Sequence, residues 1–276
     1  AMLYRDEKPG ELSGLTRLRS FSQDDGHCFC REDQIEAEFT AILLMIERAM
    51  KKYGMEYYIR LSLRDEKDKE KYLGDDTAWQ KSQKILEDVL VEKNIKYEKA
   101  EGEAAFYGPK MDLIAKDAIG RKWQLSTIQL DLNMPGRFAL EYTDENGEKK
   151  TPIMIHSAIV GSPERFLGVL IEHYAGAFPA WLAPVQAIIL PLAERHMKYV
   201  KEVSEKLKVE GVRVEVDERN ESIGKKIREA EMQKVPYMLI VGDKEVEARK
   251  AALRKYGEGD KGQMEIVDLV KEINIK

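Results

Sequence analysis

Hydrophobic positions in the first 181 residues follow two periods, which predict helices and strands in groups rather than in alternation. Residues 31–52 have apolar side chains at helical spacing, and residues 77–93 are expected to form a second helix. Residues 17–30 alternate at period two, as in a strand with two different faces. Further strands are expected at residues 56–64, 97–100, 111–117, 122–131, 138–143 and 152–160. Strands in succession predict an antiparallel sheet in an α+β domain.

The pattern changes near residues 179–184, where two prolines interrupt the helical period. Beyond this point strands and helices alternate. Strands are expected at residues 186–192, 212–216, 237–241 and 248–254, helices at 194–210, 222–234 and 266–275, and a turn at 257–262. This alternation favours a small α/β domain with a mostly parallel sheet. The sequence therefore predicts two domains, residues 1–181 and residues 182–276.

Composition and charge exclude several classes of protein. The chain has 276 residues, of which 43% are hydrophobic, so it can bury a sizeable core. No apolar run is long enough to span a bilayer, and the charged N-terminus has no signal-peptide core, so we expect a cytoplasmic protein with no membrane partner. Two neighbouring cysteines cannot form a zinc finger, and 45 basic against 50 acidic residues disfavour a protein that coats nucleic acid nonspecifically.

Residues 17–27 place unusual chemistry on one face of the expected strand. The residues of equal parity are Arg17, Arg19, Phe21, Gln23, Asp25 and His27. A strand that faces a core should be apolar on one side, and this one is not. One interpretation is an edge strand with its polar face in water. The other is a ligand platform, with guanidiniums for phosphate, a ring for stacking on a base, and a carboxylate and an imidazole for an ammonium group or a metal.

A second candidate segment begins at Ser162, which is a natural helix cap followed by Pro163 at the first helical position. Arg165 lies in the first turn, where a cation is mildly unfavourable because of the helix dipole. Either Arg165 is an exposed side chain that costs a few tenths of a kcal/mol, or a ligand requires a cation at this position.

Together these segments and several others resemble the class II aminoacyl-tRNA synthetases, and among them the threonyl-tRNA synthetases. Residues 4–7 (YRDE) with 14–27 (GLTRLRSFSQDDGH) are similar to the second class II signature, and residues 161–166 (GSPERF) to the third. Features of the threonyl enzymes are found in residues 105–110 (AFYGPK), 123–131 (WQLSTIQLD) and 154–156 (MIH). Residues 217–228 (DERNESIGKKIR) and 235–245 (VPYMLIVGDKE) resemble the anticodon-binding domain of the family.

The resemblance implies the fold and the roles of individual residues. It implies an antiparallel-sheet class II catalytic domain followed by a small α/β anticodon-binding domain. The residues implied to bind ATP are Arg5, Glu7, Arg17, Phe21, Gln124, Ser162 and Arg165, and the catalytic residues among them are Arg5, Arg17 and Arg165. The residues implied to bind threonine are Gln23, Asp25, Tyr107 and Gln129, and those implied to bind zinc are His27 and His156. The residues implied to contact the anticodon are Asn220, Arg228, Glu245 and Arg254.

The implied activity is that of an AMP-forming threonine–tRNA ligase with Mg²⁺ bound to ATP, tRNA(Thr) as partner and a homodimer in the full-length protein. The family's third zinc ligand is a cysteine that precedes the second signature, and we expect it to be missing from this chain. Cys28 is next to His27 but on the opposite face of the strand, so it should not replace that ligand. We therefore expect a chain that lacks the N-terminal part of the family, and the residues leave open whether the chain is active without that part. The alternative is a catalytically impaired paralogue that acts as an RNA-binding protein.

Overall fold

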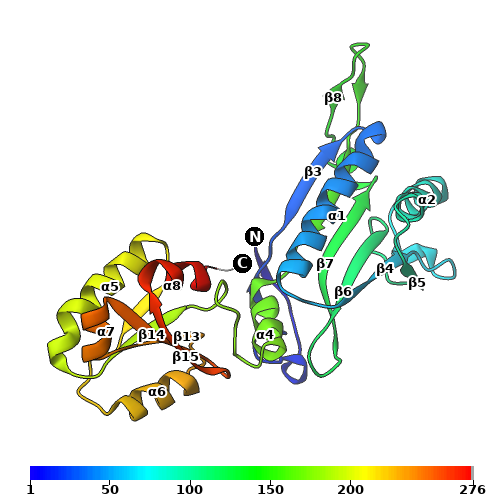
Figure 1. The fold of residues 1–276 in the computed structure, drawn as a ribbon. Coiled ribbons are helices and arrows are strands. Elements are labelled where there is room, and N and C mark those ends of the chain that lie inside the picture. Colours follow the sequence, from blue (N-terminus) through cyan, green and yellow to red (C-terminus); the bar gives the residue numbers. More distant parts are fainter. Residues whose placement is uncertain (275–276) are drawn as a thin grey trace. The chain divides into compact units, whose positions relative to one another are not determined.

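The structure is a computed structural model that describes residues 1–274, and it divides into two compact units, Ala1–His173 and Tyr174–Lys276. Ile275, expected to end the last helix, lies outside the described residues, as does the last residue of the predicted second domain. Each unit has its own sheet (Figure 1). Among residues 1–274, no helix combines the length and apolar content that a membrane span needs.

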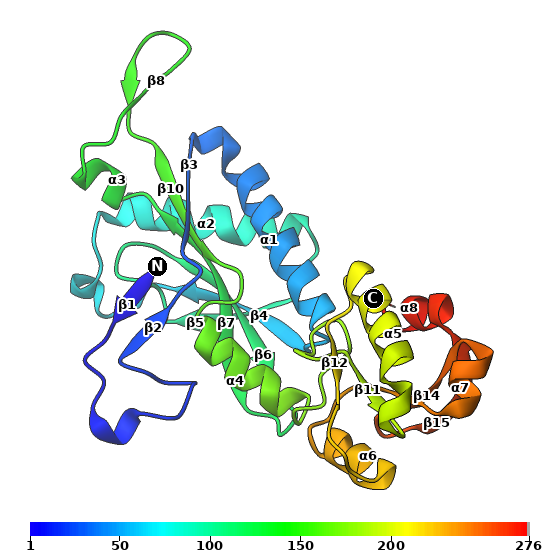
Figure 2. The same ribbon diagram turned by 90° about the vertical axis from the view of Figure 1, so that its left-hand side faces the viewer.

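A six-stranded sheet forms the centre of the first unit (Figure 2), and its strands follow the order β3-β10-β7-β6-β4-β5. Its strands are β3 (Gly26–Cys30), β4 (Tyr57–Leu63), β5 (Tyr97–Glu101), β6 (Lys110–Lys116), β7 (Lys122–Asp131) and β10 (Ile153–Ala158). All neighbours are antiparallel except β4 and β5, which confirms the antiparallel sheet predicted from the sequence. Two further pairs are β1 (Met2–Tyr4) with β2 (Ser20–Ser22), and β8 (Tyr142–Thr143) with β9 (Lys149–Lys150).

Two long helices cover one side of this sheet. The helices of the unit are α1 (Ile35–Lys52), α2 (Asp76–Glu92), α3 (Met134–Arg137) and α4 (Pro163–His173), with 3₁₀ turns at Pro9–Glu11, Glu32–Gln34 and Lys69–Lys71. Helices α1 and α2 contact each other, and both contact β7. Their apolar faces, with Ile46 and Leu86 among them, are fully buried. Because the helices occupy this side, the other side of the sheet is available for polar side chains.

The strand expected over residues 17–30 is interrupted in the structure. Residues 20–22 pair with β1, whereas residues 26–30 join the six-stranded sheet as β3. Between them, the Asp24 carboxylate accepts hydrogen bonds from the backbone N–H groups of Ile159, Val160 and Gly161. These contacts turn the chain out of one ladder and into another, so the single alternating face predicted for residues 17–27 is wrong.

The strand expected at residues 138–143 is largely absent. Instead, the short helix α3 ends at Arg137, and Leu140 donates back to Pro135 with Ala139 in the left-handed region. Asp131 at the end of β7 starts this turn, since its carboxylate accepts the N–H groups of Asn133 and Met134. Only Tyr142 and Thr143 extend into β8, at the base of a hairpin.

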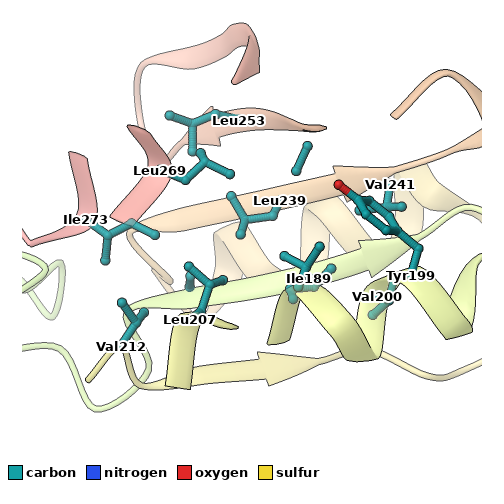
Figure 3. Close-up of a cluster of buried hydrophobic side chains, with 13 residues drawn as sticks. Ile189, Tyr199, Val200, Leu207, Val212, Leu239, Val241, Leu253, Leu269 and Ile273 are labelled. Carbon is teal, nitrogen blue, oxygen red and sulfur yellow. The ribbon is translucent and has the colours of Figure 1, made fainter. Parts of the chain in front are cut away.

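The second unit has a five-stranded sheet in the order β12-β11-β13-β14-β15. Its strands are β11 (Ala187–Pro191), β12 (Val214–Val216), β13 (Tyr237–Val241), β14 (Lys250–Lys255) and β15 (Gly259–Glu265). The helices of the unit are α5 (Met197–Val209), α6 (Ile223–Met232), α7 (Asp243–Ala248) and α8 (Ile266–Ile273), with a 3₁₀ turn at Glu194–His196. Leu207 of α5 and Leu269 of α8 belong to one buried cluster with Leu239 and Leu253 of the sheet (Figure 3). Helix α6 covers the other face, where Ala230 packs with Leu190 and Met238.

The prediction of a mostly parallel sheet is correct for half of this unit. Strands β12, β11 and β13 are parallel, but β13, β14 and β15 are antiparallel. The expected strand at 248–254 is shifted, because α7 occupies residues up to Ala248 and Arg249 closes it in the left-handed conformation. Because the connection through α7 is too short to cross the sheet, β14 returns antiparallel to β13. The turn expected at 257–262 largely becomes β15.

Candidate active site

A cleft of about 210 Å³ in the first unit is lined by every residue that the resemblance assigns to ATP. These are Arg5, Glu7, Arg17, Phe21, Gln124, Ser162 and Arg165, joined by Gln23 and Gln129 from the threonine set. They come from β2, β7, α4 and the adjoining loops, with Arg5 and Glu7 in the loop that follows β1. A larger hollow of about 1160 Å³ lies between residues 29–34 and the base of the β8–β9 hairpin, but none of the predicted site residues lines it.

Positive charge is in excess in this cleft. The Arg17 guanidinium bonds to the Glu7 carboxylate at 2.9 Å and lies 3.6 Å from that of Glu11. The Arg5 guanidinium lies over the Phe21 ring, 5.1 Å from its centroid. Burial, and then the guanidiniums of Arg5 and Arg17, lower the pKa of Arg165. Guanidiniums that lie this close repel each other unless an anion binds between them. The cleft is therefore suited to a polyanionic ligand.

Helix α4 begins as the sequence predicts. The Ser162 hydroxyl accepts a hydrogen bond from the Arg165 N–H at 3.3 Å, which makes Ser162 the cap. The Arg165 guanidinium donates through Nε to the Thr16 carbonyl at 2.9 Å. Arg165 is therefore not a freely exposed side chain, and the second of the two interpretations in the sequence analysis fits its surroundings better.

Three of the residues expected to bind threonine or zinc, His27, His156 and Gln129, share one face of the six-stranded sheet. His27, His156, Gln129 and Lys110 are successive register partners across β3, β10, β7 and β6. Side chains in such a row point to the same face and can touch. The His27 and His156 rings lie edge to face with centroids 4.7 Å apart, and the Tyr107 hydroxyl bonds to Gln129.

Carboxylates surround this cluster. His156 Nε2 lies 2.9 Å from Asp131 Oδ2, and His27 Nε2 lies 3.8 Å from Asp25 Oδ1. Burial, reinforced by Asp131 and Asp25, raises the pKa of Tyr107 to about 12. The phenol therefore stays protonated at neutral pH and can donate a hydrogen bond. The arrangement suits a small polar ligand with an ammonium group.

The zinc ligands do not make a complete set in the described part of the chain. Within residues 1–274, no group of three or more His, Cys, Asp or Glu side chains could hold a metal ion. His27 and His156 supply two imidazoles, fewer than the three protein ligands of a catalytic zinc site. The Cys28 thiol is directed to Glu38 of α1, 3.6 Å from Oε2, which confirms that it faces away from His27. Cys30 is buried.

Asp112 is a site residue that the sequence analysis missed. This fully buried carboxylate accepts hydrogen bonds from Gln124 at 2.7 Å and from Thr127 at 3.0 Å, and both of these donors line the cleft. Lys110 and Ser62 donate to its other oxygen. A signal was present, since Asp112 is the single acidic residue in the otherwise apolar run 111–115, and a buried charge needs partners.

The residues expected to contact an anticodon lie in the second unit. Arg254 is the register partner of Met238, which faces α6, so Arg254 belongs to the α6 side of the sheet. Arg254 also bonds to Glu231 of α6 at 3.1 Å. Arg228 is exposed on α6, three residues before Glu231, and Asn220 is exposed in the loop that precedes the helix.

Glu245 reaches the same side of the sheet. Its Oε1 accepts from Gln263 of β15 at 2.6 Å, and Oε2 accepts from the Gly242 N–H at 2.9 Å. Gln263 is the register partner of Ala252, which is paired in turn with Ile240 on the α6 side. We call the α6 side of this sheet, with Asn220, Arg228, Glu245 and Arg254, the α6 face.

Comparisons with known proteins agree with the fold of the two units. Residues 1–174 match the family described as tRNA synthetase class II core domain (G, H, P, S and T), and residues 186–275 match the anticodon binding domain. A threonine–tRNA ligase of Rubrobacter xylanophilus is 53% identical over 94% of this chain and 40% of its own length. That of Bacteroides fragilis is 49% identical over 98% of this chain and 42% of its own length. The chain thus spans well under half of these relatives.

A solved structure has the same fold. The RNA binding domain of threonyl-tRNA synthetase from Cryptosporidium parvum superimposes with a TM-score of 0.91 at 35% identity. The match covers 99% of this chain and 68% of that one.

Proposed function

Because the chain belongs to the class II aminoacyl-tRNA synthetases, we propose that it activates L-threonine with ATP and transfers the threonyl group to the 3′ end of tRNA(Thr). The observation that carries this proposal is the convergence of three guanidiniums and the Phe21 ring in one cleft. Adjacent to it, the Tyr107–Gln129 cluster offers a pocket of suitable chemistry for an amino acid.

In the proposed reaction, the threonine carboxylate attacks the α-phosphate of ATP in line, which forms threonyl-adenylate and releases pyrophosphate. A ribose hydroxyl at the 3′ end of the tRNA then attacks the activated carbonyl carbon and releases AMP. Arg5, Arg17 and Arg165 stabilise the negative charge on the phosphates, and Glu7 orients Arg17. Phe21 stacks on adenine, while Gln124 and Ser162 contact the nucleotide. Magnesium bound with ATP supplies further positive charge.

At the amino-acid end, Asp25 accepts from the threonine ammonium group, and Gln23, Tyr107 and Gln129 orient the substrate. His27 and His156 are two of the ligands proposed for zinc. Since the described residues provide no third ligand, no step of the proposed reaction passes through the metal. We assign the catalytic domain to residues 1–181 and the anticodon-binding domain to residues 182–276, with the α6 face as the surface that reads the anticodon.

Threonine-dependent exchange of labelled pyrophosphate into ATP tests the proposal. The chain should catalyse exchange with threonine and far less with valine, and transfer of threonine to tRNA(Thr) should follow. An RNA-binding paralogue is the second candidate, favoured by the incomplete set of metal ligands. Anticodon-selective tRNA binding without any exchange would support that candidate and contradict the first.

A further inference from the structure

Asp24 joins two segments of the cleft that are far apart in the sequence. Its Oδ2 accepts from the N–H groups of Ile159 and Val160, and its Oδ1 from that of Gly161, each at 2.8 Å. The Asp24 N–H donates in return to the Gly161 carbonyl at 3.0 Å. Three successive backbone N–H groups form a concave anion-binding site, and here a side chain of the same protein fills it.

The backbone of the second segment is shaped for this contact. Gly161 has a φ of +72°, and a Cβ on this residue would lie 2.5 Å from the Leu125 carbonyl oxygen. A larger residue would therefore be strained here and would also collide with β7. Directly after Gly161, Ser162 caps α4, which carries Arg165 in its first turn.

A second carboxylate makes a parallel link. Glu164 Oε1 accepts from the Ser22 N–H of β2, and Glu164 Oε2 accepts from the Ser162 hydroxyl, both at 2.8 Å. The segment around β2 carries Arg17 and Phe21, whereas α4 carries Arg165. The guanidiniums of Arg17 and Arg165 repel each other, so the two segments need attractive contacts to stay in register.

We propose that Asp24 is a positioning residue, which holds residues 159–165 against β2 and so keeps the Arg165 guanidinium at the phosphate site beside Arg17. Asp24 itself does not line the cleft, so it acts through Arg165 rather than by contact with the substrate. Its three hydrogen bonds are charge-assisted, which makes them stronger than contacts between neutral groups. The kinetic part of this inference rests on the proposed function.

The test uses the full chain with Asp24→Asn, alone and combined with Arg165→Ala. An amide has one acceptor oxygen and turns its NH₂ group toward a backbone donor, so at least one N–H of residues 159–161 loses its partner. We expect pyrophosphate exchange to fall about tenfold in Asp24→Asn, with a larger change in the ATP dependence than in the threonine KM. In the Arg165→Ala background, the added change should cause less than about a twofold further loss.

Asp117→Asn is the matched control. Asp117 is also a buried carboxylate that accepts backbone N–H groups, those of Ile119 and Arg121, but it lies in the β6–β7 turn outside the cleft. We expect this variant to be less stable and to keep the wild-type ATP dependence. If Asp24→Asn lowers pyrophosphate exchange by the same factor in the wild-type and in the Arg165→Ala background, the inference is overturned.

Amide hydrogen exchange provides a readout that does not need activity. Asp24→Asn should accelerate exchange at residues 159–166, whereas Asp117→Asn should leave these amides unchanged. Unchanged protection in Asp24→Asn would overturn the inference. If the parent chain activates no threonine, the proposed function fails on its own. Amide hydrogen exchange alone then decides whether Asp24 holds residues 159–165.

Discussion

The cleft of the first unit and the α6 face of the second both present arginines, but they differ in how the charge is balanced. In the cleft, burial and then the neighbouring guanidiniums of Arg5 and Arg17 lower the pKa of Arg165, and the Glu7 carboxylate bonds to Arg17. On the α6 face, Arg254 has a partner in Glu231, and Glu245 has partners in Gln263 and Gly242.

The difference indicates two ways of recognising a negatively charged ligand. Excess positive charge in a small, half-buried cleft attracts a compact polyanion and stabilises charge that develops on it. A surface whose charged groups already have protein partners gains little from an RNA backbone as such, because each protein contact must be exchanged for a contact with RNA. Such a surface favours discrimination between ligands over affinity, as expected of a site that reads bases.

The largest effect should come from removing the charge excess. Arg165→Ala or Arg17→Ala should lower threonine-dependent pyrophosphate exchange by about 100-fold or more, because a charged contact made in the transition state is lost. Circular dichroism should show that the fold survives. Arg31→Ala is the matched control, since Arg31 pairs with Asp33 outside the cleft. Near wild-type exchange in either cleft variant would remove its assigned role.

Glu245→Gln should have a smaller effect, directed at selectivity. A carboxylate close to RNA is unfavourable unless it accepts a hydrogen bond from a base, so its loss should weaken discrimination at one anticodon base by about tenfold. Total affinity for tRNA should change less. Filter binding with anticodon-mutant transcripts measures both quantities. An equal loss for every anticodon would leave Glu245 with no role in reading.

Arg254→Ala should reduce tRNA affinity by a few-fold and, if Arg254 contacts a phosphate, lower the salt dependence of binding by about one unit of slope. Binding at two salt concentrations measures this. Arg249→Ala serves as the control, because Arg249 pairs with Glu202 of α5, which packs on the opposite face of the sheet. If Arg254→Ala and Arg249→Ala weaken tRNA binding equally, Arg254 has no specific role in binding at the α6 face.

The smallest change is expected in metal content. Because His27 and His156 are two ligands where a catalytic zinc site has three, metal analysis after dialysis should find zinc well below one per chain. Cys28→Ala should leave this value unchanged, since the thiol is directed to Glu38. Full occupancy that disappears in Cys28→Ala would contradict both the ligand count and the orientation of this side chain.

Local patterns in the sequence were sufficient for much of the fold. Strands β7 and β13 have the predicted bounds, and α1 lies within the predicted helical segment. Ser162 caps α4 as expected, and Ser222, where a helix was predicted to begin, caps α6. These features depend on side chains within a few positions of one another, where periodicity and capping chemistry act directly. The resemblance likewise identified the residues that line the cleft, since each signature is a contiguous stretch of chain.

Other features depended on partners that the local sequence does not contain. The break in residues 17–30 is caused by Asp24 binding backbone donors 135 to 137 positions away, and Asp112 organises Gln124 and Thr127 from another strand. The antiparallel half of the second sheet follows from the short turn after α7. Whether a given arginine is balanced by a carboxylate also depends on which segments fold together. Hydrophobic periodicity therefore determined most of the elements, whereas long-range hydrogen bonds and charge pairing, which only the tertiary structure brings about, decided where some of them break and how they form the site.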